Sequence, residues 1–363
     1  MTMQKQMPES PKNSPIFFII GRPRSGTSML SRMFDAHPNV SIPFECPYIL
    51  ALHRKYGNIS NWTKERLICF FNDLSSQRWQ RKAWRIDRDR LKEDLMKCEG
   101  KNTYADICRV VHAQAISVFP KEEIKIIGDT TPNYSLRLTE LFNMFPDALY
   151  IHLIRDYRDH LNSMLNIGFF DGVVPEILHR WNSSAKSMFL LTQKYPDRIF
   201  SIRYEDLVMN PLEKFNEMCH FLHIPEHPDA LDFYKKGNEI REQVNSELFE
   251  QVHKSLFNPV DTSRIGRYKD TLSADTLKMA EMISGTYGKL YDYEPTINPR
   301  EYPSRFKVYQ RLTLIHFYNS ILYMIRRLPL PLYRKCKSFL PSIGSIYYFF
   351  FPGDNTKKGT QVN

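Results

Sequence analysis

The chain has 363 residues, of which 42% are hydrophobic and 25% are charged, and this length can bury one large core or two smaller ones. The formal net charge is +10, but residues 301–363 contain ten basic side chains and only two acidic ones and so carry most of it. Because the first 300 residues are nearly neutral, the charge does not indicate a nucleic-acid-binding protein, and we expect no nucleic-acid partner.

The cysteines and the N-terminal segment indicate where in the cell the protein is expected. The six cysteines are scattered, without a C-x-x-C pair or a metal-ligand spacing, so we expect reduced thiols and no metal site. The polar segment Met1–Ser14 lacks the apolar region of a signal peptide. These features predict a cytoplasmic protein.

Four apolar segments alternate with helical patterns along the chain. The predicted strands are Ile16–Ile20, Ile124–Ile127, Leu149–Ile154 and Ile199–Tyr204. The predicted helices are Thr27–Asp35, Ser135–Phe145, Arg158–Leu165 and Pro175–Lys194. This alternation predicts an α/β fold with a mostly parallel sheet flanked by helices, in which ligands bind at the carboxyl ends of the strands.

The segment Gly21–Leu30 directly follows the first predicted strand and opens a helix. Main-chain N–H groups of such a turn and the positive end of the helix dipole converge on one point, which favours an anionic ligand. The spacing matches the Walker pattern G-x-x-x-x-G-K-S/T, except that Thr27 replaces the lysine that reaches the β and γ phosphates of a nucleoside triphosphate. Arg24 supplies a cation instead, which favours a phosphate-like anion other than the end of ATP.

A second candidate anion site follows the strand Leu149–Ile154. Arg155 comes directly after that strand, and Ser163 lies eight residues later on the next predicted helix. A guanidinium and a hydroxyl can hold one phosphate together if the intervening turn folds over. An ordinary charged turn is the alternative interpretation.

The two sites together resemble those of the sulfotransferases that use 3′-phosphoadenosine 5′-phosphosulfate (PAPS). The Pro-Arg-Ser-Gly-Thr core of the first loop resembles their 5′-phosphosulfate loop, and Arg155 with Ser163 resembles their 3′-phosphate site. The segment from Arg24 to Glu45, with its Asp-Ala-His-Pro sequence, closely resembles the tyrosylprotein, Golgi-type and bacterial members. The resemblance implies a P-loop NTPase-like sulfotransferase fold, PAPS as the co-substrate, 3′,5′-ADP as a product and no required metal.

The resemblance also implies roles for individual residues. Tyr204 would lie near the adenine, and the basic loop Ser263–Lys269 would fold over the 3′-phosphate, with the contribution of each cation left open. The residues predicted to bind the co-substrate are Arg22, Pro23, Arg24, Ser25, Gly26, Thr27, Ser28, Arg155, Ser163, Tyr204, Arg264 and Arg267. Lys269 stays open as a further contact of the 3′-phosphate.

Sulfuryl transfer to a hydroxyl requires a general base within reach of the acceptor. Glu45 lies among apolar residues and prolines, which can raise the pKa of a carboxyl group toward neutrality, and the resemblance places the base at this position. Glu45 and Arg24 are therefore the predicted catalytic residues. His37 precedes a proline and more often closes a turn, whereas His112 and His152 stay open because cytosolic sulfotransferases use a histidine.

The chain departs from the family pattern in the segment Gly128–Pro132. Many members carry a lysine there that contacts the transferring group, whereas this chain has Thr130. Either Arg24 alone neutralises the leaving phosphate or another cation enters the site. The two possibilities stay open at this point.

Two segments lie outside the resemblance. Residues from about 58 to 120 are predicted to form a helical insertion and an acceptor wall. Residues 301–363 form a basic aromatic extension whose apolar runs are too short to span a bilayer. This extension either completes the core or covers the acceptor pocket, or it contacts a membrane surface through residues 305–352. The predicted sulfotransferase domain is 15–300.

The leading prediction is a PAPS-dependent sulfotransferase acting on an apolar alcohol such as a sterol, a steroid or a lipid, because the insertion and the extension are rich in aromatic residues. A carbohydrate hydroxyl or a peptide tyrosine is the alternative acceptor. Two other classes remain open: a P-loop phosphotransferase with Asp129 as the magnesium ligand, and a basic membrane-surface binding protein. The predicted location is cytoplasmic, at the periphery of the inner membrane surface.

Overall fold

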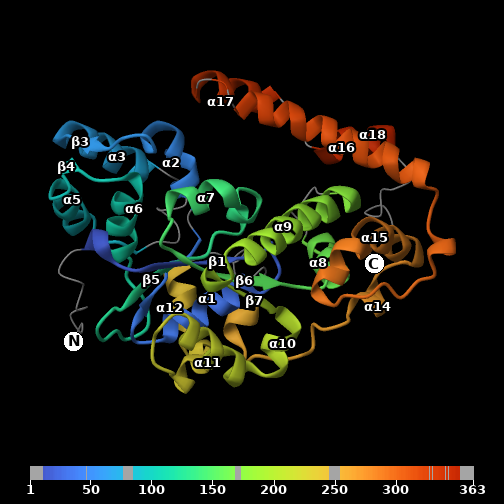
Figure 1. The fold of residues 1–363 in the computed structure, drawn as a ribbon, viewed down its shortest axis with the longest axis horizontal. Coiled ribbons are helices and arrows are strands. Elements are labelled where there is room, and N and C mark those ends of the chain that lie inside the picture. The colour runs from blue at the N-terminus through green and yellow to red at the C-terminus, as the bar shows by residue number, and fades with distance from the viewer. Residues whose placement is uncertain are drawn as a thin grey trace. The chain divides into compact units, whose positions relative to one another are not determined.

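The computed structural model describes residues 11–45, 47–76, 85–167, 173–244, 254–326, 328, 330–339, 341 and 343–351 (Figure 1). The chain divides into two compact units. The first consists of residues 1–155 and 187–263, and the second of residues 156–186 and 264–363.

A five-stranded parallel sheet forms the centre of the first unit, in the order β2-β5-β1-β6-β7. Its strands are β1 (Ile16–Ile20), β2 (Val40–Ser41), β5 (Ile126–Asp129), β6 (Leu149–Ile154) and β7 (Ile199–Arg203). The predicted α/β fold with a parallel sheet is therefore confirmed. The second predicted strand, Ile124–Ile127, begins two residues later than expected, at Ile126, and β2 has only two residues, too few to give a sequence pattern.

Helices cover both faces of this sheet. Figure 1 shows α1 (Thr27–Ala36) and α11 (Pro211–Phe221) on one face and α7 (Leu138–Met144) on the other. The rings of Phe34 and Phe215 lie 5.0 Å apart where the first two helices meet. The predicted helix Ser135–Phe145 divides into the 3₁₀ turn Pro132–Leu136 and α7. The remaining elements of the first unit are α10 (Tyr204–Met209), α12 (Gly237–Val244) and the 3₁₀ turns Pro11–Asn13, Pro196–Arg198, Pro228–Lys236 and Lys254–Phe257. Helix α9 (Val174–Lys194) contributes residues to both units.

The insertion is mainly helical, as predicted, but it also contains a small antiparallel sheet. Its elements are β3 (Asn61–Trp62), α3 (Lys64–Ser76), α5 (Arg88–Met96), β4 (Gly100–Lys101) and α6 (Tyr104–Ala113), and α2 (Tyr48–Tyr56) directly precedes it. Trp62 is buried, and its indole N–H donates to the carbonyl of Asn102 at 3.0 Å. Trp62 therefore belongs to the core of the insertion, whereas Trp79 and Trp84 lie outside the described residues.

The second unit is helical. It contains α8 (Tyr157–Leu165), α14 (Tyr268–Thr271), α15 (Ala274–Gly288), the 3₁₀ turns Lys289–Tyr291 and Pro299–Glu301, α16 (Arg305–Arg326), α17 (Leu330–Phe339) and α18 (Ile343–Phe350). Ile315, Tyr318 and Tyr347 of the basic extension are buried together with Val173. Part of the extension thus completes a core, and the membrane-surface contact of residues 305–352 stays a prediction.

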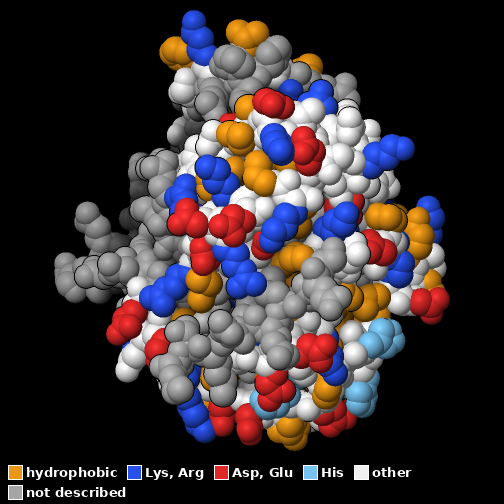
Figure 2. Space-filling view, turned by 90° about the vertical axis from the view of Figure 1, so that its left-hand side faces the viewer, with side chains coloured by type: hydrophobic (Ala, Val, Ile, Leu, Met, Phe, Trp, Pro, Cys, Tyr) orange, Lys and Arg blue, Asp and Glu red, His pale blue; other side chains and the backbone are white. Residues whose placement is uncertain are grey.

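The surface charge and the helix lengths of the described residues bear on two kinds of partner, nucleic acids and membranes. Figure 2 shows basic and acidic side chains interspersed on the face that it draws, in keeping with the near-neutral charge of the first 300 residues. Within the described residues, every helix falls short of the length or the apolar character that crossing a membrane requires.

Candidate active site

The turn between β1 and α1 has the geometry of an anion-binding loop. Ser25 N–H donates to the carbonyl of Arg22 at 3.1 Å, and both Arg24 (φ +72°) and Gly26 (φ +95°) have left-handed backbones. Gly26 immediately precedes α1 and offers no side-chain cap. The first N–H groups of α1 therefore face the turn without a capping side chain, as an anion at a helix start requires.

The loop is packed so closely that glycine is required at two positions. A Cβ atom on Gly26 would lie 2.7 Å from the ring of Tyr204, and a Cβ on Gly21 would lie 2.6 Å from the carbonyl oxygen of Leu153. These distances are far shorter than a normal van der Waals contact. The two glycines therefore let the loop lie directly against the end of β6 and the start of α10 (Tyr204–Met209).

Three residues that are distant in sequence meet beside this loop. Arg155 Nη1 donates to the carbonyl oxygen of Arg24 at 3.1 Å, and its guanidinium carbon lies 4.7 Å from the ring centroid of Tyr204. They meet because β1, β6 and β7 are neighbouring parallel strands whose carboxyl ends share one edge of the sheet. The structure thus brings together three of the predicted co-substrate residues.

The other residues of the loop differ in their surroundings. Ser25 and Thr27 are buried, whereas Pro23 and Ser28 are half-buried. Arg22 is also buried, and its Nη1 donates to Ser135 Oγ at 3.2 Å. Sequence reasoning missed Ser135, which lies in the 3₁₀ turn Pro132–Leu136 after β5.

Buried polar atoms gather at the carboxyl end of β5. Asp129, Thr130 and Thr131 are each 3% exposed or less. Among the described residues, neither threonine hydroxyl has a hydrogen-bond partner, and neither has Oδ1 of Asp129. A buried polar group without a partner costs free energy, so hydroxyl donors in this position fit a site for a bound anionic group. The expected lysine is absent here, and its place is taken by a buried hydroxyl.

Glu45 has the environment of a general base. Burial, and after it the charge of Asp129, raises the pKa of its carboxyl group to about 7. Glu45 is exposed as a whole residue, whereas its carboxyl group is the part that is surrounded by protein atoms and poorly hydrated. A carboxyl group that titrates near neutrality is suited to accept a proton from an acceptor hydroxyl.

A buried histidine holds the carboxylate that raises this pKa. His112 Nε2 lies 2.9 Å from Asp129 Oδ2, and His112 Nδ1 lies 2.8 Å from the hydroxyl of Tyr48. His112 and Asp129 are 0% and 2% exposed as whole residues. From the sequence, His112 is only an alternative base, because no local pattern pairs it with Asp129, 17 residues away.

The other two histidines have structural contacts. His37 Nε2 contacts the carbonyl of Pro225 at 2.8 Å, and its Nδ1 accepts from Asn39 N–H at 3.1 Å. His152 lies inside β6 and contacts Ser201 Oγ at 3.0 Å. Burial lowers the pKa of His37 to about 4, against the opposing effect of its bond to Pro225, and lowers that of His152 to about 3. These contacts favour Glu45 among the predicted bases.

The remaining predicted residues belong to the second unit. Ser163 is half-buried on α8, Arg264 is half-buried, and Arg267 and Lys269 are exposed in the loop before and at the start of α14. Ser163 and the loop therefore lie in the same compact unit, and their roles at the 3′-phosphate stay predictions.

Comparison with known families identifies the chain. The model of the sulfotransferase family matches residues 15–229, more than half of the sequence. The chain belongs to the sulfotransferase family. It is an enzyme that transfers sulfate, and this membership confirms the predicted family.

Individual relatives refine this result. The sulfotransferase is 24% identical over 299 residues to protein-tyrosine sulfotransferase 1 of Danio rerio, covering 80% of this chain and 76% of that protein. It is 25% identical over 304 residues to protein-tyrosine sulfotransferase 1 of Rattus norvegicus, covering 80% and 73%. A solved sulfotransferase domain of the Synechococcus PCC 7002 olefin synthase is similar with 21% identity and a TM-score of 0.49, covering 78% of this chain and 98% of that one.

Two predictions change in the light of these relatives. The predicted cytoplasmic location is wrong, because the relatives are protein-tyrosine sulfotransferases, which belong to the Golgi-type class and not to the cytosolic one. Scattered cysteines and a polar N-terminus were insufficient evidence for a compartment. The preference for a sterol or lipid acceptor is not supported either, and the relatives fit the alternative of peptide tyrosine better.

Proposed function

We propose that this sulfotransferase transfers the sulfuryl group of PAPS to the phenolic hydroxyl of a tyrosine in a peptide or protein. The observation that carries the proposal is the meeting of Arg24, Arg155 and Tyr204 beside the uncapped start of α1. Backbone N–H groups and two guanidinium groups suit an anionic nucleotide, and an aromatic ring suits its base. The names of the relatives support tyrosine as the acceptor.

The chemistry follows from the groups that surround the loop. The bond between sulfur and the 5′-phosphate oxygen breaks, a new bond forms between sulfur and the acceptor oxygen, and the acceptor proton passes to Glu45. Arg24, the start of α1 and the hydroxyls of Thr130 and Thr131 would bind the anionic oxygens. With Thr130 in place of the lysine, Arg24 is the cation that we assign to the leaving phosphate.

The pKa of Glu45 adds a physical reason for a phenol. Proton transfer is efficient when the pKa of the base approaches that of the acceptor group. A carboxyl group with a pKa of about 7 lies about three units below a tyrosine phenol, and much further below an aliphatic alcohol. The site is thus better matched to a tyrosine than to a sterol.

The test combines nucleotide binding with an acceptor panel. We expect 3′,5′-ADP to raise the melting temperature of the full chain, and ATP with magnesium to leave it nearly unchanged. With labelled PAPS, we expect transfer to a tyrosine peptide and none to the same peptide with phenylalanine. Equal stabilisation by both nucleotides would contradict the co-substrate. Transfer only to a sterol or a sugar would contradict the acceptor, and phosphoryl transfer from ATP would favour the phosphotransferase alternative.

A further inference from the structure

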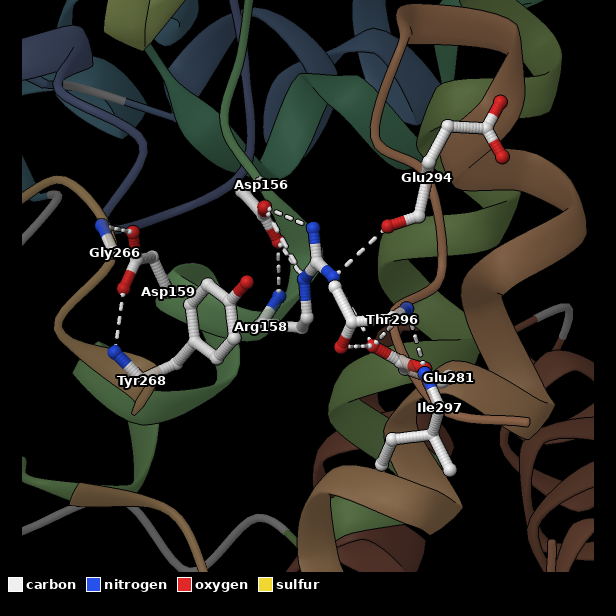
Figure 3. Close-up of polar contacts among 9 residues, drawn as sticks. All are labelled: Asp156, Arg158, Asp159, Gly266, Tyr268, Glu281, Glu294, Thr296 and Ile297. Carbon is white, nitrogen blue, oxygen red and sulfur yellow. Dashed lines mark hydrogen bonds and ion pairs between the residues drawn. The ribbon is translucent and has the colours of Figure 1, made fainter. Parts of the chain in front are cut away.

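The carboxylate of Asp159 holds the main chain of the basic loop in the second unit. Asp159 lies on α8 and is 1% exposed. Its Oδ2 accepts from Gly266 N–H at 2.6 Å, and its Oδ1 accepts from Tyr268 N–H at 2.9 Å, as Figure 3 shows. Charge-assisted hydrogen bonds of this kind are stronger than those between neutral groups. One buried side chain therefore fixes two amides of the loop.

The conformation that Asp159 fixes depends on a glycine. Gly266 has φ +71°, a left-handed backbone that other residues adopt only with strain. A Cβ at this position would meet nothing closer than 3.9 Å, so space does not require the glycine here. The requirement comes from the backbone, which must turn so that the amides of residues 266 and 268 both point at one carboxylate.

Tyr268 connects the loop to a second set of buried contacts. Its ring centroid lies 4.6 Å from the guanidinium carbon of Arg158. Arg158 Nη2 donates to Asp156 Oδ2 at 2.7 Å, and its Nη1 donates to Glu281 Oε1 at 3.1 Å (Figure 3). Burial acts to lower the pKa of Arg158, but the hydrogen bond and charge of Asp156 outweigh it and the net shift is upward. Arg158 therefore remains a cation, paired with the carboxylates of Asp156 and Glu281.

Glu281 of α15 connects Arg158 to the segment that follows this helix. Its two oxygens accept from Thr296 N–H at 2.9 and 3.0 Å, from Thr296 Oγ1 at 2.8 Å and from Ile297 N–H at 2.8 Å. Polar contacts thus join helix α8, helix α15 and the segment after it, and the contact between Arg158 and Glu281 is buried (Figure 3). The contacts of Asp159, Arg158 and Glu281 together hold the loop, so it does not depend on a single hydrogen bond.

The helical register of α8 places Asp159 beside Ser163. Asp159 and Ser163 are four residues apart on α8, so they lie on the same face of the helix, one turn from each other. The loop that Asp159 holds therefore lies on the helix face that presents the Ser163 hydroxyl. Arg264 and Arg267 lie on either side of Gly266 in the sequence, and the amide of Gly266 is one of the two that Asp159 holds.

We propose that Asp159 is a positioning residue of the 3′-phosphate subsite: by holding the amides of Gly266 and Tyr268, it sets Arg264 and Arg267 on the Ser163 side of α8, where they bind the 3′-phosphate. This inference rests on the proposed function. It predicts that Asp159 controls recognition of the 3′-phosphate and has little effect on the rest of the nucleotide.

The test compares two nucleotides that differ only in the 3′-phosphate. Isothermal titration of the full chain with 3′,5′-ADP and with 5′-AMP gives the ratio of their affinities. Replacing Asp159 by Asn leaves one acceptor and introduces an N–H₂ group against a main-chain donor. We expect Asp159→Asn to weaken 3′,5′-ADP binding at least tenfold and 5′-AMP binding less than twofold. Asp275→Asn, at an exposed carboxylate of the same unit, is the matched control and should change neither.

A second variant covers the case in which Asp159→Asn fails to fold. Gly266→Ala strains the backbone without a clash, and we expect the same selective loss of 3′,5′-ADP affinity. Folded variants that keep the wild-type ratio of affinities, or lose both nucleotides equally, would overturn the positioning role. A wild-type chain that binds 5′-AMP as well as 3′,5′-ADP would instead overturn the proposed function, and the inference with it.

Discussion

The imidazole Nε2 of His112 lies 2.9 Å from Oδ2 of Asp129, the last residue of β5, and both residues are buried. His112 comes from α6 of the insertion, and its other nitrogen contacts Tyr48 of α2. The insertion therefore contributes to the site by fixing the carboxylate that repels the charged form of Glu45.

The first prediction concerns the pH dependence of turnover. Glu45 accepts a proton only when it is deprotonated, so kcat/KM should rise with pH through about 7. Asp129 disfavours the charged form of Glu45, so Asp129→Asn should lower the pKa of Glu45 and move the acidic limb to lower pH. Burial is the larger cause of the raised pKa of Glu45 and is unchanged in this variant. The acidic limb should therefore stay above the pKa of an ordinary glutamate. Glu99→Gln, at an exposed carboxylate, is the control, and an acidic limb that shifts equally in both variants would contradict the coupling.

The second prediction concerns Glu45 itself. Glu45→Gln retains the size of the side chain but cannot accept the proton, and kcat should fall on the order of 10²- to 10⁴-fold. Binding of 3′,5′-ADP, measured by titration, should be unchanged because the role proposed for Glu45 concerns the acceptor and not the nucleotide. Full turnover in this variant would move the base to another residue, of which His112 would be tested next.

The third prediction uses two glycines with the same backbone conformation. Gly26 and Gly100 have φ of +95° and +100°, but a Cβ at Gly26 would lie 2.7 Å from Tyr204, whereas a Cβ at Gly100 meets nothing within 4 Å. Gly100→Ala should cost only the left-handed strain, about 1–2 kcal/mol. Gly26→Ala should cost more and should weaken 3′,5′-ADP binding at least tenfold, measured by denaturant unfolding and by titration. Equal losses in both variants would show that the loop is not held against Tyr204.

The fourth prediction concerns stability. Glu281 is 2% exposed and accepts hydrogen bonds from Arg158, Thr296 and Ile297. Glu281→Ala leaves Arg158 with one carboxylate fewer and should lower the free energy of unfolding by about 3–5 kcal/mol. Glu301→Ala, which removes a largely exposed carboxylate 3.7 Å from Lys278, should change it by less than about 1 kcal/mol. Urea unfolding followed by circular dichroism measures both, and similar midpoints would refute the structural role of Glu281.

Local sequence patterns were sufficient where neighbouring residues determine the structure. The apolar runs of β1 and β6 predicted both strands with their exact bounds, because a buried parallel strand is a continuous apolar segment. The turn after β1 was predicted from the glycines, hydroxyls and arginines of the eight residues 21–28. The two-residue strands β2, β3 and β4 were missed, since pairs this short gain their hydrogen bonds from partners far along the chain.

The sequence by itself determined the α/β fold, the family and the loop that opens α1, because each depends on contiguous residues whose order imposes local structure. Only the tertiary structure decided which distant groups meet. Arg155 reaches Arg24 across 131 positions, His112 reaches Asp129 across 17, and Asp159 reaches Gly266 across 107. Such contacts arise when neighbouring strands or helices pack side by side, and their spacing along the chain carries no local pattern by which they can be predicted.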